Sequence, residues 1–133
     1  MQLDLIQLQS LLALAEHSTD EICGVLLGRS DPIILTRIVP GRNVHREPDR
    51  HFLLDAATLL HADALARSTG DAIIGFYHSH PNGRTVPSLP DRADAWLHTI
   101  MLIIGGGHRQ LRYVSAWTVR DGTFMVERID LIR

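Results

Sequence analysis

Apolar residues recur at helical spacing in two parts of the chain. Near the N-terminus they form a stripe of Leu5, Leu8, Leu11, Leu12 and Ala15. This stripe predicts an amphipathic helix over residues 3–17. A second segment, rich in Ala and Leu, begins after Asp55, a residue type that caps helices, and ends at Gly70, which is typical of a helix C-terminus. The pattern therefore predicts two helices far apart in the sequence.

Short apolar or alternating runs between turn residues predict the strands of a sheet. These runs cover residues 21–28, 33–39, 52–54, 73–80, 100–104, 109–120 and 123–129. The turn-rich segment 29–32 predicts a hairpin between the first two strands, and Asp121-Gly122 predicts another between the last two. A further helix is expected from Ser88 to about Leu97. The expected fold is α/β, with a mixed, mostly antiparallel sheet flanked by helices.

The composition is that of an ordinary globular protein. The chain has 133 residues, of which 45% are hydrophobic and 21% charged, so we expect one domain over residues 1–133. A net charge of −2 excludes a strongly basic nucleic-acid surface. The single cysteine, Cys23, cannot form an internal disulfide, and its apolar neighbours predict a small buried residue. The N-terminus lacks the basic start of a secretory signal, and no apolar run is long enough to span a membrane, so we expect a cytoplasmic protein.

Metal-binding residue types gather after the strand predicted for residues 73–80. His78 and His80 end this strand, and because residues i and i+2 share a face, both imidazoles point the same way. Turn residues in the segment 81–87 can bring Asp91 back toward them. Two imidazoles and one carboxylate suit one zinc ion per chain and leave a fourth position for water. Ser88 and Asp91 also fit a capping box, a structural interpretation that is compatible with the metal site.

The same residues carry a family resemblance. The spacing His-x-His, seven residues, Ser-x-x-Asp resembles the signature of the JAMM (MPN+) metallopeptidases, and Glu21-Ile22-Cys23-Gly24 is similar to the family's upstream Glu-x-x-Gly segment. The resemblance implies that His78, His80 and Asp91 bind zinc. It also implies the JAMM/MPN fold, whose layout is similar to that of the cytidine deaminases. Base deamination itself is excluded, because its zinc site needs more cysteines than this chain has.

The resemblance assigns two further residues to the chemistry. A carboxylate near the metal must take a proton from water and hand it to the leaving amine. Glu21 is the candidate, because a charged residue is unexpected at the start of an apolar strand and partial burial would raise its pKa. The alternative is a solvated carboxylate at a strand end. Ser88 would donate a hydrogen bond to the oxyanion of the tetrahedral intermediate.

The family typically hydrolyses the amide or isopeptide bond that follows the Gly-Gly tail of a ubiquitin-like protein. Only eight residues separate Asp91 from Ile100 and no cysteine follows, so the chain resembles compact prokaryotic members more than ubiquitin-chain-specific enzymes. Cleavage of a small adduct from a sulfur-carrier protein and removal of a ubiquitin-like modifier both remain open. A RadC-like protein and a non-catalytic MPN binding module are the alternatives.

Two expectations concern the remaining polar residues. The loop 41–51 carries Arg42, Arg46 and Arg50, and we expect it to be the edge against which an extended substrate tail is laid as an added strand. A solvated, mobile loop is the alternative. The other histidines lack partners at ligand spacing, except for the loosely separated His45 and His51. All of them are expected on the surface or in loops; they are His17, His45, His51, His61, His98 and His108.

Overall fold

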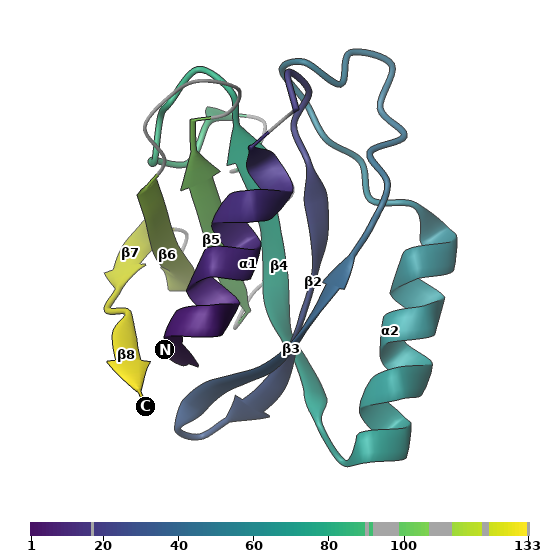
Figure 1. The fold of residues 1–133 in the computed structure, drawn as a ribbon, viewed down its shortest axis with the longest axis vertical. Helices are drawn as coiled ribbons and strands as arrows, with labels where there is room; N and C mark the ends of the chain where they lie inside the picture. The colour runs from purple at the N-terminus through teal and green to yellow at the C-terminus, as the bar shows by residue number, and fades with distance from the viewer. Residues whose placement is uncertain (17, 90, 92–98, 107–112, 121–122, 133) are drawn as a thin grey trace.

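The structure is a computed structural model, and it describes residues 1–16, 18–89, 91, 99–106, 113–120 and 123–132. In this part of the chain, eight strands form one sheet in the order β7-β6-β5-β4-β2-β3-β1-β8. The strands are β1 (Gln2–Asp4), β2 (Cys23–Ser30), β3 (Ile33–Pro40), β4 (Ala72–His80), β5 (Ile100–Gly105), β6 (Tyr113–Arg120), β7 (Thr123–Glu127) and β8 (Asp130–Ile132). The helices are α1 (Leu5–Ala15) and α2 (Ala56–Thr69) (Figure 1).

The sheet is mixed, as the sequence predicts. β2 lies antiparallel between β3 and β4, and β5, β6 and β7 continue in antiparallel pairs. The parallel pairs are β4 with β5, and β1 with both β3 and β8. The predicted α/β architecture with a mixed, mostly antiparallel sheet is therefore confirmed.

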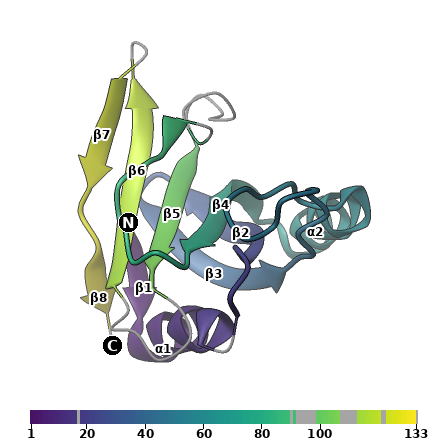
Figure 2. The ribbon, with the colours of Figure 1, turned by 90° about the horizontal axis from the view of Figure 1, so that it is seen from above.

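Each helix covers its own part of the sheet. Leu11 and Ala15 of α1 pack in a core that includes Leu26 of β2, whereas Ala62 and Ala66 of α2 pack in a second core that includes Val25 and Leu27. Neighbouring residues of a strand face opposite sides. β2 is consequently buried on both faces, which explains why its sequence is a continuous apolar run. Figure 2 shows the two helices well apart, with α2 beside β2 and β3.

The two ends of the strand order are joined by the C-terminal segment. Only Arg128 and Ile129 separate β7 from β8, yet β7 pairs with β6 and β8 pairs with β1 at the opposite end of the order. The sheet therefore curls, and Figure 2 shows β7 and β8 following one another along one side of the molecule. The amino group of Met1 donates to the carbonyl of Arg128 at 2.8 Å, which fixes the N-terminus beside this junction.

The first two predicted helices are present, and the first begins later in the chain than predicted. α1 begins at Leu5 and not at residue 3, because Asp4 is its N-cap and accepts a hydrogen bond from the backbone of Gln7 at 2.7 Å. The preceding residues form β1, a strand that the sequence pattern missed. The second helix is confirmed, with Asp55 as N-cap and Gly70 as a left-handed C-cap at φ 77°.

Two strand predictions were wrong. Residues 52–54 do not form a strand, and only Leu54 makes a single bridge, to Asn43. The run 123–129 is not one strand, because it ends at Glu127 where the chain changes from one side of the sheet to the other. Most of the helix expected from Ser88 to about Leu97 lies outside the described residues, which omit residues 90 and 92–98. The first part of the predicted strand 109–120, at residues 109–112, and the predicted turn at residues 121–122 also lie outside them.

Candidate metal centre

The two histidines lie where three strands meet at one end of the sheet. His78 and His80 are the last residues of β4, between β2 and β5, and His78 is opposite Cys23 of β2. Both side chains are buried, with 1% and 6% of their surface exposed. Figure 1 shows that the loops after β3 and after β4 both lie at this end of the molecule. The strand spacing thus presents both imidazoles together, as predicted.

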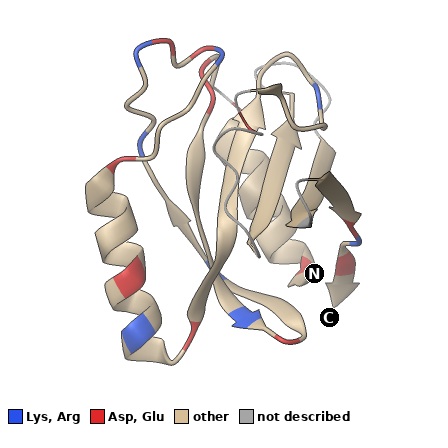
Figure 3. Ribbon diagram, turned by 180° about the vertical axis from the view of Figure 1, so that it is seen from behind, with Lys and Arg blue, Asp and Glu red and all other residues tan. Residues whose placement is uncertain are grey.

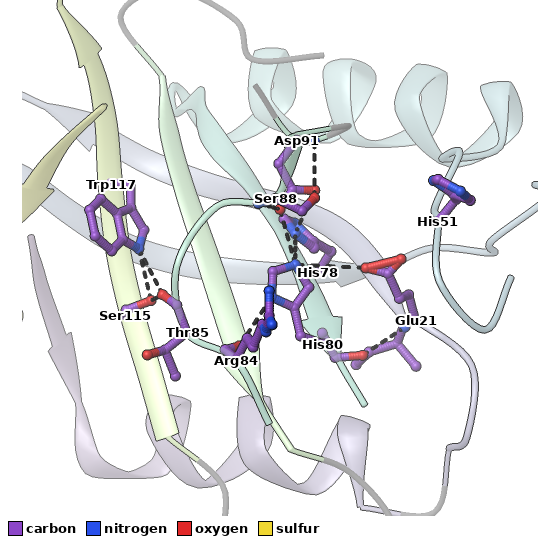
Figure 4. A network of polar contacts seen from close by, with 12 residues as sticks. Glu21, His51, His78, His80, Arg84, Thr85, Ser88, Asp91, Ser115 and Trp117 are labelled. Atoms are coloured by element: carbon purple, nitrogen blue, oxygen red, sulfur yellow. Dashed lines mark hydrogen bonds and ion pairs between the residues drawn. The ribbon is translucent and has the colours of Figure 1, made fainter. Parts of the chain in front are cut away.

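Asp91 meets both imidazoles. Its Oδ1 lies 3.1 Å from Nε2 of His78, its Oδ2 lies 3.0 Å from Nε2 of His80, and the two Nε2 atoms are 3.1 Å apart (Figure 4). Ligand atoms held at 2.0–2.1 Å around a tetrahedral zinc ion are expected about 3.3 Å apart. The two Nε2 atoms and the two carboxylate oxygens of Asp91 that converge here are therefore spaced nearly as the ligands of a zinc ion are.

The hydrogen bonding of His80 adds a chemical reason for a cation. Nδ1 of His80 lies 3.0 Å from the carbonyl oxygen of Arg84. A carbonyl only accepts, so Nδ1 carries a hydrogen, and Nε2 of the neutral ring has a lone pair. That lone pair faces Nε2 of His78 and an oxygen of Asp91, which is unfavourable unless a proton or a metal ion lies between them. A backbone carbonyl on the opposite ring nitrogen is also the usual partner of a metal-binding histidine.

The start of a helix holds Asp91 in place. The backbone N–H of Ser88 donates to Oδ2 of Asp91 at 2.8 Å, and the backbone N–H of Asp91 donates to Oγ of Ser88 at 3.2 Å. The predicted capping box is therefore present in the same residues as the ligand set. Burial opposes ionisation of Asp91, but hydrogen bonds from His78 and His80 outweigh it and hold the pKa of this carboxyl well below its usual range.

Glu21 is a second buried carboxyl group at the site. Its Oε1 lies 3.8 Å from Nε2 of His80, and its Oε2 is buried with no hydrogen-bond partner among the described residues. Burial raises the pKa of Glu21 to about 7, although His80 acts in the opposite direction. Together with His78 and His80, Glu21 also forms a group that could hold a metal ion, with ligand atoms within 4.8 Å of one another. Asp91 is nevertheless the closer carboxylate to both rings.

The backbone of Glu21 is fixed from two directions. Its N–H donates to the carbonyl of Pro48 at 2.7 Å, and its carbonyl accepts from the side chain of Asn43 at 2.8 Å. The next residue, Ile22, is tied to β4 because its N–H donates to Oγ of Ser79 at 2.9 Å. The β4 end and the loop after β3 therefore both position this carboxyl group.

Asn43 organises the loop that follows β3. Its amide donates to the carbonyls of Glu21 and His51 at 2.8 Å each, and its oxygen accepts from the N–H groups of His45 and Leu53 at 3.1 and 3.0 Å. The sequence pattern predicted a loop here, which is confirmed. It did not predict that Asn43 is the hub of the loop, the residue whose side chain bonds to several of its backbone groups. The charged residues of the loop gather at the end of the molecule where β4 ends (Figure 3).

A pocket of about 130 Å³ opens beside the histidines, between the loops after β3 and β4. Its lining residues are Glu21, Asp49, Arg50, His80, Pro81, Asn82, Arg84, Val86, Pro87 and Ser88. Both residues that the sequence assigned to catalysis, Glu21 and Ser88, thus border the same space. Oγ of Ser88 accepts a hydrogen bond from Asp91, so its own hydrogen is available to another acceptor.

Phe52 and Cys23 lie beside His78, and the structure also describes three of the remaining histidines. Phe52, expected in a strand, instead stacks on the ring of His78, with ring centroids 4.4 Å apart. Cys23 is buried as predicted, and burial raises the pKa of its thiol to about 12, so it is a poor nucleophile. His61 is exposed as expected. His45 and His51 lie in the loop after β3, and His17, His98 and His108 are outside the described residues.

Comparison with known proteins agrees with this site. Residues 6–120 match the family described as prokaryotic homologs of the JAB domain. The chain belongs to this JAB-domain family. The resemblance to the JAMM (MPN+) proteins that the metal-binding motif suggested is therefore confirmed.

Two relatives are similar in sequence. The desampylase of Haloferax volcanii is 38% identical over 99 residues, which are 74% of this chain and 70% of the relative. A probable TtuB-protein conjugate cleaving protease of Thermus thermophilus is 32% identical over 92 residues, which are 69% of this chain and 60% of the relative. The match thus spans less than two thirds of the second relative.

Two solution structures share the fold. A protein of Desulfitobacterium hafniense superimposes with a TM-score of 0.87 at 29% identity, covering 98% of this chain and 92% of the other. A protein of Salinibacter ruber gives 0.74 at 25% identity, covering 98% and 90%. Neither of the helices within the described residues has the length and apolar character needed to span a bilayer.

Proposed function

We propose that this JAB-family protein is a zinc metallopeptidase that hydrolyses the amide or isopeptide bond after the C-terminal Gly-Gly tail of a ubiquitin-like or sulfur-carrier protein. His78, His80 and Asp91 hold one zinc ion per chain. The observation that carries this proposal is the convergence of the two Nε2 atoms and the carboxylate of Asp91, with contacts of 3.0–3.1 Å, and with Glu21 as a second carboxyl group beside them.

The zinc ion, when bound, supplies a Lewis acid that polarises the scissile carbonyl and acidifies water. Glu21 then accepts a proton from the attacking water and passes it to the leaving amine. Its buried Oε2 has no hydrogen-bond partner within the part of the chain that the structure describes, and a pKa of about 7 is suited to both accepting and donating a proton near neutrality. The hydroxyl group of Ser88 donates a hydrogen bond to the oxyanion that forms at the carbonyl.

The substrate class rests on the relatives and on the size of the pocket. The name of one relative refers to the cleavage of TtuB-protein conjugates, and the other is a desampylase. A pocket of about 130 Å³ beside buried histidines suits residues without side chains, such as two glycines. The loop 41–51 contributes Asp49 and Arg50 to this pocket and remains the proposed contact for the substrate tail. A metal-free binding module would have no use for a buried Glu21 whose Oε2 has no hydrogen-bond partner among the described residues.

The proposal is tested with three substrates, each of which carries a different group after the Gly-Gly tail of the same ubiquitin-like protein. The first is a linear fusion after Gly-Gly, the second an isopeptide conjugate to lysine, and the third a small amino-acid adduct. We expect cleavage after Gly-Gly that stops when a chelator removes zinc and resumes when zinc is added. A matched substrate with Val in place of the last Gly should resist cleavage. The preferred substrate decides between modifier removal and adduct release.

Failure of the zinc-loaded protein to cut any of the three substrates would refute the substrate class. Cleavage that continues at the same rate in the metal-free protein would refute the metal mechanism.

A further inference from the structure

Two side chains of β6 converge on one backbone carbonyl of the loop after β4. Ser115 Oγ–H donates to the carbonyl oxygen of Thr85, and Nε1–H of Trp117 is shared between that oxygen at 3.1 Å and Oγ of Ser115 at 2.9 Å (Figure 4). Residues i and i+2 of a strand share a face, so both donors reach the same point. Both acceptor positions of the Thr85 carbonyl are thereby occupied.

The carbonyl that they hold belongs to the residue after Arg84. Arg84 in turn supplies the carbonyl that accepts from Nδ1–H of His80 at 3.0 Å. The two carbonyls belong to successive planar peptide units that are joined at the Cα of Thr85. Only φ and ψ of Thr85 separate them, so fixing the Thr85 carbonyl narrows the directions open to the Arg84 carbonyl. A continuous path of hydrogen bonds and two successive peptide units therefore connects β6 to the ring of His80.

The loop also has no space to move toward the sheet. A Cβ atom added at Gly105 would lie 2.5 Å from the Thr85 side chain, 2.7 Å from the Gly83 carbonyl and 3.0 Å from the Arg84 carbonyl. The carbonyl of His80 accepts from the N–H groups of Gly83 and Gly106 at 2.9 Å each. The loop is thus packed closely against the backbone of Gly105, and Ser115 and Trp117 hold it by hydrogen bonds to Thr85.

We propose that Ser115 and Trp117 are positioning residues for the metal centre. By holding the loop at Thr85 they keep the Arg84 carbonyl against Nδ1 of His80, which fixes the ring in the tautomer whose Nε2 can bind a metal ion. Neither residue touches the site itself. This inference rests on the proposed role of His80 as a zinc ligand. Loss of the partner that orients a metal-binding histidine typically weakens metal affinity about 10- to 100-fold.

The variants Trp117→Phe and Ser115→Ala test the proposal, because each removes one donor and keeps most of the side-chain volume. Tyr113→Phe is the matched control, since it lies on the same strand and its side chain is 59% exposed. The zinc dissociation constant, measured by competition with a chelator, should rise about 10-fold or more in each single variant. The double variant should be less than additive, because both donors act on the same carbonyl. Ser115→Thr, which retains the hydroxyl, should restore most of the affinity.

A second readout does not depend on zinc. Two-bond ¹H–¹⁵N spectra of the metal-free protein at high pH report the His80 tautomer; the wild type should carry its hydrogen on Nδ1, and the two variants should show a mixture. Zinc affinity and tautomer populations that match the wild type in the variants would overturn the proposal while leaving the metal site intact. If His80→Ala kept full zinc affinity, the ligand assignment would fail instead, and the tautomer result alone would decide the role of Ser115 and Trp117. The two single variants are independent, so either one carries the test if the other does not fold.

Discussion

Asp91 and Glu21 are buried carboxyl groups beside the same pair of histidines, and their surroundings differ sharply. Asp91 lies within hydrogen-bond distance of both rings and also accepts from the backbone of Ser88. Glu21 comes only within 3.8 Å of His80, and one of its oxygens has no partner among the described residues. The pKa of Asp91 is well below its usual range, whereas the pKa of Glu21 is raised to about 7.

The contrast teaches how one site separates two roles of the same functional group. Burial disfavours the charged form of both carboxyls, and only Asp91 has enough hydrogen-bond donors to overcome it. A carboxylate that stays ionised suits a metal ligand, and one that titrates near neutrality suits proton transfer. Substitutions that remove one of the two carboxyls, or the residues around them, should therefore have distinct effects on zinc binding, turnover and stability.

The largest effect is expected from removing the histidines that both carboxyls share. The variant His78→Ala/His80→Ala should lose its zinc and all measurable peptidase activity, because two of three protein ligands are gone. Elemental analysis of the purified protein measures the metal content. His61→Ala on the exposed face of α2 is the matched control and should bind zinc as the wild type does. A double variant with full zinc content would show that the ligand set lies elsewhere.

Ser88 is expected to have an intermediate effect on turnover. Ser88→Ala removes the proposed oxyanion donor but leaves the Ser88 N–H that holds Asp91. We expect kcat to fall about 10²-fold with zinc affinity nearly unchanged, as for the loss of one such donor elsewhere. Steady-state kinetics and zinc competition on the same preparation separate the two effects. A fall in zinc affinity as large as the fall in kcat would assign Ser88 to the capping box alone.

The opposite pKa shifts predict opposite effects on the stability of the metal-free protein. The stability that protonated Glu21 contributes is present below its unfolded pKa and is lost as the pH rises through about 7. Glu21→Gln, which cannot ionise, should therefore gain stability relative to the wild type between pH 4 and pH 8, by at most about 3 kcal/mol at 1.4 kcal/mol per pKa unit. Asp91 stabilises the fold above its unfolded pKa, and this contribution is lost only at pH values below it. Asp91→Asn should therefore be less stable than the wild type at both pH 4 and pH 8, by a nearly constant amount.

Urea unfolding of both variants and the wild type at the two pH values gives these differences. Changes of the same sign for Glu21→Gln and Asp91→Asn would remove the contrast on which the two roles rest.

The smallest effect concerns the loop after β3 on the Glu21 side. Deleting this loop would remove the Asn43 hub and the Pro48 carbonyl that position Glu21, so single substitutions are the cleaner test. Arg50→Ala should raise KM several-fold for a Gly-Gly-tailed carrier protein and change kcat little, because Arg50 lines the pocket but is not one of the proposed ligands or catalytic residues. A short Gly-Gly peptide should be cut equally well by both proteins. Identical KM values for the carrier would exclude Arg50 from substrate binding.

The metal motif was predictable from the sequence because its residues are close together in the chain. Strand periodicity places His78 and His80 on one face, and the capping pattern at Ser88 brings back Asp91. These are local rules, and the structure brings together the three side chains that they select. Glu21 was expected at the site mainly from the resemblance to a family, since nothing local distinguishes it from a carboxylate at the end of a strand.

The supports of the site could not be predicted in this way. These supports act through contacts between segments that are distant in the sequence; they are Asn43, Phe52, Ser115 and Trp117. Residues of these types are also common in ordinary cores and turns, so nothing in the sequence singles them out. Likewise β1 was missed, because it is only three residues long and exists through its pairing with the C-terminal β8. Short apolar runs such as residues 52–54 look like strands. Here the side chain of Asn43 accepts from the backbone N–H of Leu53, and the segment makes only a single bridge in place of a strand ladder.

The most direct test of the two-carboxylate account compares Glu21→Gln with Asp91→Asn for zinc content and for turnover of a Gly-Gly-tailed fusion. The account predicts that Glu21→Gln keeps one zinc ion per chain and loses several orders of magnitude in kcat, because the water has no proton acceptor. Asp91→Asn should lose both zinc and activity. If Glu21→Gln loses its zinc while Asp91→Asn retains it, the third ligand is Glu21 and the roles proposed for the two carboxyls are reversed.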